Sequence, residues 1–384
     1  MVSTSRMRIE LAAPLALWLA ARILVTGVAL VTQYLQPGHG LWSSPDPGWL
    51  FRVLFAWDSS YYLQIAAEGY PSGAVTPLHA FLPGYPLTAR GVAWLLEPAG
   101  PTEQALVVAL WLVPLVASAG AAVLMWHLAR DHGGRRVAAL ATALLVAGPY
   151  SVFLAASYAE SLFLVLALGA WLAATRERWL LAGVLAALAG AVRPNGIMLA
   201  AALAVMYVVQ CRAHGRPLLS PSLAGVVVAP LGALAHVVYL YSVTGSVTAW
   251  TQAQELGWGR TTQWPWLTFY QTAGRVLYAS TPDRQIQFAL DICFAFVLVA
   301  GVVVYIRRRS WPEATYVGLT ALALMTSFTY VSLARTTVLM FPLMIAVAGV
   351  RSPRYRRLPW VVLALGLVLL VFNTHQFTLG LWAD

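Results

Sequence analysis

Repeated runs of about twenty apolar residues constrain this chain more than any other feature, because a helix needs roughly that length to cross the ~30 Å core of a bilayer. The runs lie at 12–34, 104–128, 137–156, 161–175, 179–192, 196–211, 223–243, 288–306, 312–332, 336–350 and 359–376. They follow one another along the whole sequence. We therefore predict an all-α polytopic membrane protein with about eleven transmembrane helices, in which 1–384 forms a single membrane domain.

Composition excludes the soluble classes of protein. The 384 residues are 60% hydrophobic and only 10% charged, and the mean hydropathy is +0.72. A soluble domain carries about a quarter charged residues, so an ordinary cytosolic enzyme, a disordered protein and a secreted disulfide scaffold are all excluded. The formal net charge is +10, but the basic residues form no single patch. We expect membrane lipids as partners and no nucleic acid.

All basic residues are arginines, and their positions predict the orientation. They cluster at Arg6/Arg8, Arg130/Arg135/Arg136, Arg176/Arg178, Arg212/Arg216, Arg307/Arg308/Arg309 and Arg351/Arg354/Arg356/Arg357. If the ambiguous apolar piece 79–96 does not cross the membrane, every cluster falls on one side, as the positive-inside rule requires. We therefore predict a cytosolic N-terminus and an outer C-terminus. A long first outer loop, 33–103, then holds juxtamembrane helices, and 244–287 forms a second large outer loop.

Several predicted spans are bounded by charged residues that stand too close together. Glu160 and Arg176 are separated by only 15 residues, about 22 Å of helix, which is about 8 Å short of the hydrocarbon thickness. The same shortfall recurs between Arg178 and Arg193, between Asp291 and Arg307, and between Arg335 and Arg351. Charges within the membrane face a bundle interior or a wet cavity, which predicts a polar cavity open to the outside. A thinner membrane or longer loops are the alternative.

The first outer loop contains an acidic residue among aromatic ones. The stretch from Trp57 to Pro71 predicts a short helix with Asp58 as its N-cap and Gly69 just past its end. Capping does not explain the neighbouring Trp57, Tyr61 and Tyr62. A carboxylate beside aromatic rings at a membrane surface can bind a sugar and take a proton from its hydroxyl. From spacing alone, a cap and a catalytic base remain equal alternatives.

Two further motifs place polar groups at the predicted outer ends of spans. Arg193-Pro194-Asn195-Gly196 breaks a helix and offers a guanidinium and an amide together. The stretch 157–161 places hydroxyls and the Glu160 carboxylate at another outer turn. Each motif alone is also compatible with an ordinary turn.

Together these motifs resemble the PIG-V-type mannosyltransferases. In chain order they are Trp57-Asp58 with its Tyr-Leu-x-Ile-Ala-x-x-Gly-Tyr continuation, Phe81-Leu82-Pro83-Gly84-Tyr85-Pro86, Ser157-Tyr158-Ala159-Glu160-Ser161, Arg193-Pro194-Asn195-Gly196, and Ser332-Leu333-Ala334-Arg335 before Phe341-Pro342. The motifs stand in the family's order from about 57 to 342. Leu82 and Pro194 depart from the family pattern, which has a second aromatic residue and a serine at these places.

The resemblance implies a GT-C glycosyltransferase that acts on the non-cytosolic face. Its donor would be a polyprenyl-phosphate sugar, here mannose, and its acceptor a lipid or a glycan of the envelope. Asp58 would be the base of an inverting transfer, with Trp57, Tyr61, Tyr62, Glu160 and Asn195 in the substrate site. Arg193 and Arg335 are the first candidates to hold the leaving phosphate, and Arg260, Arg275 and Arg284 are the second. No classical metal cluster is visible, although a divalent ion between Asp58 and Glu160 is an open alternative.

The predicted location is the bacterial plasma membrane with the site facing outside, or the lumenal face of the endoplasmic reticulum in a eukaryote. A multi-span transporter or flippase is the alternative function, and Arg22 in the middle of the first span favours it. Transporters often contain internal repeats, and the sequence shows none. A non-catalytic envelope scaffold is a third interpretation, and the presence of Asp58 argues against it.

Overall fold

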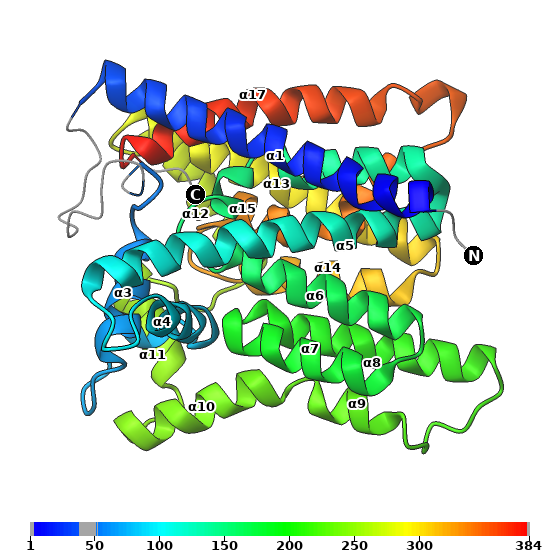
Figure 1. Cartoon of the computed structure of the whole chain (residues 1–384), viewed down its shortest axis with the longest axis horizontal. Helices are drawn as coiled ribbons and strands as arrows, with labels where there is room; N and C mark the ends of the chain where they lie inside the picture. Colours follow the sequence, from blue (N-terminus) through cyan, green and yellow to red (C-terminus); the bar gives the residue numbers. More distant parts are fainter. Residues whose placement is uncertain (1–3, 38–50, 52, 382–384) are drawn as a thin grey trace. The chain divides into compact units, whose positions relative to one another are not determined.

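The computed structural model describes residues 4–37, 51 and 53–381 of the chain. Segment 38–50 and Arg52 of the predicted first outer loop lie outside the described residues, as do the side chains of Arg6 and Arg8. The regular secondary structure of the described residues is helical and includes no strand (Figure 1). The prediction of an all-α chain is therefore confirmed for this part.

The chain divides into two compact units, which we describe one at a time. The first consists of the described residues within Met1–Leu63, Thr88–Leu168 and Thr337–Ala383, and the second of Gln64–Leu87 and Gly169–Thr336. Three helices have residues in both units, namely α3 (Asp58–Glu68), α4 (Gly84–Leu96) and α6 (Glu160–Thr175). At 13 residues, α4 is about 20 Å long. This helix, which forms most of the ambiguous piece 79–96, is shorter than a bilayer core.

The first unit is built around long apolar helices. Its further elements are α1 (Thr4–Leu35), α5 (Glu103–Val146), η2 (Ser151–Leu154), η3 (Thr337–Leu339), α16 (Phe341–Ala348), η4 (Pro353–Tyr355) and α17 (Leu358–Thr378). Helix α1 packs on α5 and α17, and α16 packs on α5. Small buried residues such as Ala121 and Ala129 on α5 allow this close helix packing.

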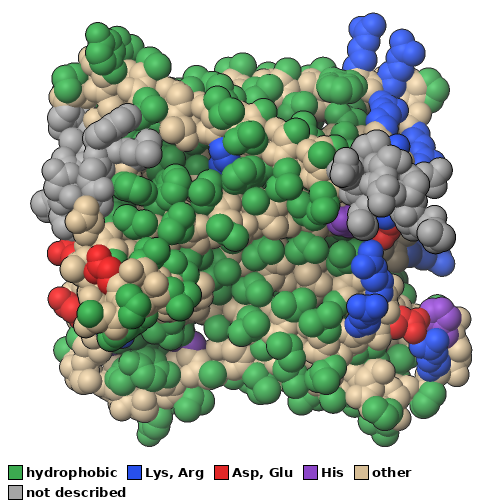
Figure 2. Space-filling view, viewed as in Figure 1, with side chains coloured by type: hydrophobic (Ala, Val, Ile, Leu, Met, Phe, Trp, Pro, Cys, Tyr) green, Lys and Arg blue, Asp and Glu red, His purple; other side chains and the backbone are tan. Residues whose placement is uncertain are grey.

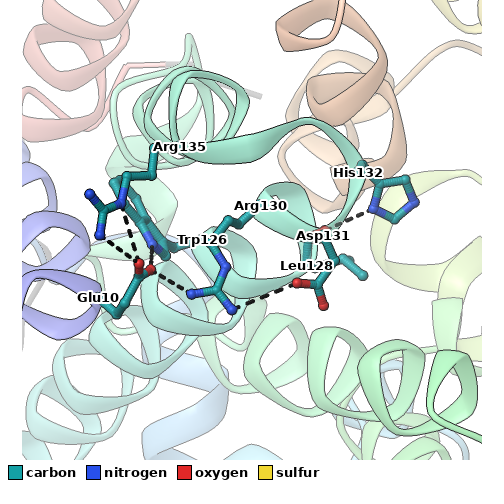
Figure 3. A network of polar contacts seen from close by, with 7 residues as sticks. All are labelled: Glu10, Trp126, Leu128, Arg130, Asp131, His132 and Arg135. Carbon is teal, nitrogen blue, oxygen red and sulfur yellow. Dashed lines mark hydrogen bonds and ion pairs between the residues drawn. The ribbon is translucent and has the colours of Figure 1, made fainter. Parts of the chain in front are cut away.

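Helix α5 is interrupted, as the sequence predicted from the gap between its two apolar runs. Gly133 and Gly134 have non-helical dihedral angles, and the φ of +77° at Gly134 is one that glycine adopts without strain. Glu10 of α1 binds both sides of the interruption. Its carboxylate accepts from Trp126 Nε1 at 2.7 Å and pairs with Arg130 at 2.9 Å and Arg135 at 3.3 Å (Figure 3).

The first unit therefore has two chemically different ends. Glu10, Arg130 and Arg135 form one of them. Thr32 lies 22 residues further along α1, about 33 Å away, and its hydroxyl is 3.0 Å from His375 Nδ1 of α17. Helices α1 and α17 consequently run in the same direction. The arginine-rich segment 351–357 before α17 thus belongs to the same end as Glu10, as the charge pattern predicted.

The second unit contains shorter helices. These are η1 (Pro77–Ala80), α7 (Trp179–Val192), α8 (Asn195–Ala213), α9 (Leu223–Val228), α10 (Leu231–Thr244), α11 (Ala249–Trp258), α12 (Pro265–Tyr278), α13 (Pro282–Arg307), α14 (Trp311–Met325) and α15 (Leu333–Thr336). Helix α7 packs on α8, α9 and α10, and α13 packs on α12, α14 and α15. At one end of the α7–α8 pair, Glu177 binds Arg216, and this contact lowers the pKa of Glu177.

Among the described residues, six helices are long and apolar enough to cross a membrane. They are Glu10–Leu35, Glu103–Val146, Asn195–Ala213, Leu223–Thr244, Pro282–Arg307 and Pro353–Thr378. Apolar helices α6 and α7 are shorter, with 16 and 14 residues. Hydrophobic side chains also cover the visible faces of the helices (Figure 2). The chain is an integral membrane protein.

Prolines and turns shorten several predicted spans. The predicted span 137–156 ends as a helix at Val146, just before Gly148-Pro149. The predicted span 223–243 divides at Pro230 into α9 and α10. The predicted span 336–350 is mostly a 3₁₀ turn followed by the eight-residue α16, which begins next to Pro342. Proline lacks the N–H of a regular helix, which explains the first two endings.

Candidate active site

Helix α3 carries the predicted catalytic acid in its first turn. Trp57 precedes it in the left-handed region (φ 54°), which is uncommon for a large side chain. Asp58 is the first helical residue. The helix ends at Gly69, whose φ is +84° and whose amide donates to Ile65 O at 2.9 Å. The predicted short helix is confirmed. The predicted N-cap role of Asp58 is corrected, because Asp58 is the first residue of the helix and Trp57 precedes it.

A set of hydrogen bonds ties segment 54–59 to residues 157–158, within the first unit. The amide of Ser157 donates to Leu54 O at 3.3 Å, and Ser59 Oγ donates to Ser157 O at 3.2 Å. The hydroxyl of Tyr158 donates to Ala56 O at 3.2 Å and accepts from the Asp58 amide at 3.2 Å. We call these four bonds the Tyr158 clamp. They fix the backbone on both sides of Asp58.

Aromatic rings support the Tyr158 clamp. The ring of Tyr158 packs edge-on against Phe153 at 5.1 Å, Phe377 at 5.7 Å and Tyr62 at 6.4 Å between centroids. Phe153 also packs on Phe377 at 5.5 Å. Tyr158, Phe153 and Phe377 are fully buried. Such edge-to-face contacts are worth about 0.5–1.5 kcal/mol each beyond their buried area, so the clamp is held in a packed environment.

The predicted site residues around Asp58 differ in their exposure to solvent. Trp57, Asp58 and Tyr61 are partly exposed, whereas Tyr62 and Glu160 are buried. Glu160 is the first residue of α6, where the helix dipole favours a carboxylate. The other acidic residue of α3, Glu68, is exposed and accepts from Gln64 at 3.4 Å. Asp58 is therefore the acid of α3 that has both a fixed backbone and access for a substrate.

The Asp58 site lies at the end of the first unit opposite to Glu10. Phe377, which contacts Tyr158, is two residues from His375, the partner of Thr32. Thr32 in turn is about 33 Å from Glu10 along α1. The predicted outer residue and the predicted cytosolic arginines thus occupy opposite ends of this unit.

Arg193 and Asn195 lie in the second unit, at the turn between α7 and α8. Arg193 is partly exposed and extended (φ −145°), while Asn195 is buried as the first residue of α8. A Cβ on Gly196 would lie 2.3 Å from Gly190 Cα, so the two helices touch here. A Cβ on Gly84 would lie 2.8 Å from Ala191 O. The second and fourth sequence motifs are therefore brought together.

Arg335 also lies in the second unit and is buried in the short helix α15. The amide of Ala334 donates to Asp291 Oδ1 of α13 at 2.7 Å. Arg260 donates to Val331 O at 3.2 Å and to Gln254 Oε1 at 3.1 Å. The remaining second candidates, Arg275 and Arg284, have exposed side chains. Asp291 and Arg260 thus fix the backbone on the N-terminal side of Arg335.

No group of three or more histidine, cysteine, aspartate or glutamate side chains suited to a metal ion occurs in the described ranges. The alternative of a divalent ion between Asp58 and Glu160 stays a hypothesis.

Tyr158 and Asp291 are the structural contributors that sequence reasoning did not assign to the site. Tyr158 stands inside a recognised motif, but its partner Asp58 is 100 residues away. Asp291 was visible only as a charge inside a predicted span. A side chain that binds distant backbone leaves no periodic or spacing signal, so neither role could be found without coordinates.

Comparison with known proteins finds a family match over part of the chain. Residues 47–217 match the family described as mannosyltransferase (PIG-V). GPI alpha-1,6-mannosyltransferase 2 of Mus musculus is 37% identical over 169 residues, which cover 42% of this chain and 33% of the mouse protein. The Cricetulus griseus protein of the same name is 37% identical over 39% of this chain and 30% of its own length. The chain thus spans about a third of the length of the curated relatives it matches.

Solved structures with detectable likeness include an oligosaccharyltransferase from Archaeoglobus fulgidus. Its apo form is 12% identical, with a TM-score of 0.49 over 97% of this chain and 56% of that chain. A complex with an inhibitory peptide and a dolichol-phosphate gives a TM-score of 0.45 over 95% and 56%. The family match contains Asp58, Glu160, Arg193 and Asn195 and ends before Arg335. Over residues 47–217, the resemblance to the PIG-V mannosyltransferases that the motifs indicated is confirmed.

Proposed function

We propose that the chain is a GT-C-type membrane mannosyltransferase. It takes mannose from a polyprenyl-phosphate-mannose donor and transfers it to a hydroxyl of a lipid-linked or envelope acceptor on the non-cytosolic face. The observation that carries the proposal is the placement of Asp58. A partly exposed carboxylate stands in the first turn of α3, and the Tyr158 clamp fixes its backbone. This residue lies inside the range that matches the mannosyltransferase family.

The reaction we infer is a single displacement. The Asp58 carboxylate takes the proton of the acceptor hydroxyl while that oxygen attacks the anomeric carbon of mannose. The bond between the anomeric carbon and the phosphate oxygen breaks, and polyprenyl phosphate leaves with the electron pair. The configuration at the anomeric carbon is inverted. The candidates from the sequence motifs to stabilise the charge of the leaving phosphate are Arg193 and Arg335.

The location of the reaction is inferred from charge. The arginine-rich end of the first unit is the end that the positive-inside rule places in the cytosol, and Asp58 lies at the opposite end. A lipid-linked donor is the appropriate sugar source there, because nucleotide sugars belong to the cytosol. In bacteria this face is the outside of the plasma membrane.

The test is transfer of radiolabelled mannose in membranes with and without the full chain. We expect label from polyprenyl-phosphate-mannose in a lipid or glycan product, together with release of polyprenyl phosphate, only when the chain is present. GDP-mannose is the matched control and should give no product in washed membranes. Absence of transfer from the lipid donor, or direct transfer from GDP-mannose, would overturn the proposal.

A further inference from the structure

The chain breaks its helical hydrogen bonding just after α5, in the region between two apolar helices. Helix α5 ends at Val146, and Pro149 follows three residues later. Pro149 has no N–H, so Leu145 O loses its regular helical donor, and Val146 O stands at the open end of the helix. An unsatisfied carbonyl in an apolar environment costs several kcal/mol. The carbonyl groups at this break therefore need hydrogen-bond donors from other parts of the chain.

Side chains supply those donors. Ser151 Oγ donates to Leu145 O at 2.8 Å, and Asn373 Nδ2 of α17 donates to Pro149 O at 2.9 Å. Arg22 of α1 donates from Nη2 to Val146 O at 3.1 Å and to Ser151 O at 3.3 Å. Two helices that are distant in sequence therefore hold the same turn.

Burial of the charged Arg22 side chain in a membrane span costs free energy. It lies near the middle of the candidate span Glu10–Leu35 and is only 5% exposed. Its Nε and Nη1 atoms have no hydrogen-bond partner within the described part of the chain. A charged side chain within a membrane span is tolerated only where its contacts matter. The contacts it makes are those with the turn after α5.

A short path of residues leads from this turn to Asp58. After the turn, η2 carries Phe153, and the chain then reaches Ser157 and Tyr158 of the Tyr158 clamp. Phe153 and Tyr158 both pack on Phe377. Phe377 stands one helical turn after Asn373 on α17. A shift of the turn would therefore be passed to the clamp through packed rings and backbone.

We infer that Arg22 is a positioning residue for Asp58. Together with Asn373, it holds the turn at Pro149 and thereby keeps the Tyr158 clamp and the α3 backbone in the arrangement that transfer requires. The catalytic part of this inference rests on the proposed mannosyl transfer. The structural part, that loss of Arg22 loosens segment 54–59, does not.

The experiment measures both parts on the purified full chain in nanodiscs. The variants are Arg22→Gln, Arg22→Lys, Asn373→Leu and the double variant Arg22→Gln/Asn373→Leu. Thr32→Val is the matched control, because Thr32 is also a buried polar residue of α1 that contacts α17, but at His375 rather than at the turn. Amide hydrogen exchange of residues 54–60 is the readout that needs no activity, and kcat and KM are measured alongside.

We expect Asn373→Leu, which loses one buried hydrogen bond, to speed exchange of 54–60 about tenfold. Arg22→Gln, which loses two, should speed exchange at least as much. We expect kcat to fall by a similar factor with little change in KM. The double variant should be only slightly worse than either single one, since both side chains hold one turn. Arg22→Lys should recover part of kcat, and Thr32→Val should match the wild type.

Wild-type exchange and kcat in Arg22→Gln would overturn the inference. If that variant does not fold, Asn373→Leu decides in the same way. Faster exchange with unchanged kcat would also overturn it, because the segment would then be loosened without consequence for transfer. An inactive wild type refutes the proposed function instead, and the exchange measurement still decides whether Arg22 positions segment 54–59.

Discussion

At the scale of single residues, Asp58 combines an accessible carboxylate with an immobilised backbone. In Asp58→Asn the side chain keeps its size and its ability to accept a hydrogen bond, but it can no longer take a proton. Removal of a general base costs about 10²–10⁴-fold in rate. We expect kcat to fall by at least two orders of magnitude while the melting temperature stays within about 2 °C.

Glu68→Gln is the matched control for this prediction. It neutralises the other acid of α3, which is exposed and contacts Gln64, and it should keep wild-type turnover. Near-normal turnover of Asp58→Asn would mean that Asp58 has only a structural role in the helix.

The hydroxyl of Tyr158 gives a second residue-scale prediction. Tyr158→Phe keeps the ring packing on Phe153 and Phe377 but leaves Ala56 O and the Asp58 amide without their shared partner. Leaving buried polar groups unsatisfied costs about 1–3 kcal/mol, so both stability and kcat should fall. The melting temperature and kcat of the purified variant measure this.

Tyr305→Phe serves as the comparison for Tyr158→Phe. Tyr305 is buried, and its hydroxyl has no hydrogen-bond partner in the described ranges, so its removal should cost nothing. Equal effects of the two substitutions would show that the Tyr158 clamp contributes no more than ring packing.

At the scale of elements, the close approach of α7 and α8 determines where Arg193 and Asn195 stand. Gly196→Ala would place a Cβ 2.3 Å from Gly190 Cα and force the two helices apart. Overpacking of this kind costs about 1–3 kcal/mol. We expect a lower melting temperature and weaker donor binding. Gly27→Ala on α1, where a Cβ would meet nothing within 4 Å, should leave both unchanged.

Apolar runs and helix-ending residues predicted most of the helices. Both signals depend only on residues that are close together in the sequence. The short helix after Trp57 and the interruption at Gly133 and Gly134 are examples. The early end of the predicted span 137–156 was missed, although Gly148-Pro149 signals it, because the apolar run continues beyond the proline. The hydrogen bonds that Arg22 and Asn373 donate to that turn join segments far apart in the sequence. A local sequence pattern cannot predict such contacts.

At the scale of the whole molecule, the predicted orientation can be tested along one helix. Gln104 and Arg136 are exposed residues at the start of α5 and just after its interruption. The part of α5 from Gln104 to the interruption at Gly133 is about 42 Å long. In a variant lacking Cys211 and Cys293, Gln104→Cys should react with an impermeant thiol reagent in intact cells. Arg136→Cys should react only after the cells are opened. Ser72→Cys, in the predicted first outer loop, should behave like Gln104→Cys. The reverse pattern would place Asp58 in the cytosol.

The shortness of α7 has a consequence for the lipids around the protein. Its 14 residues span about 21 Å, and its exposed side chains are apolar, among them Leu180, Val184 and Leu188. We expect lipids beside this helix to compress to match it, at a cost of a fraction of a kcal/mol for each ångström of hydrophobic mismatch. The acyl-chain length of the lipid should therefore change the stability of this protein. Nanodiscs of short-chain lipids should raise its melting temperature relative to long-chain ones.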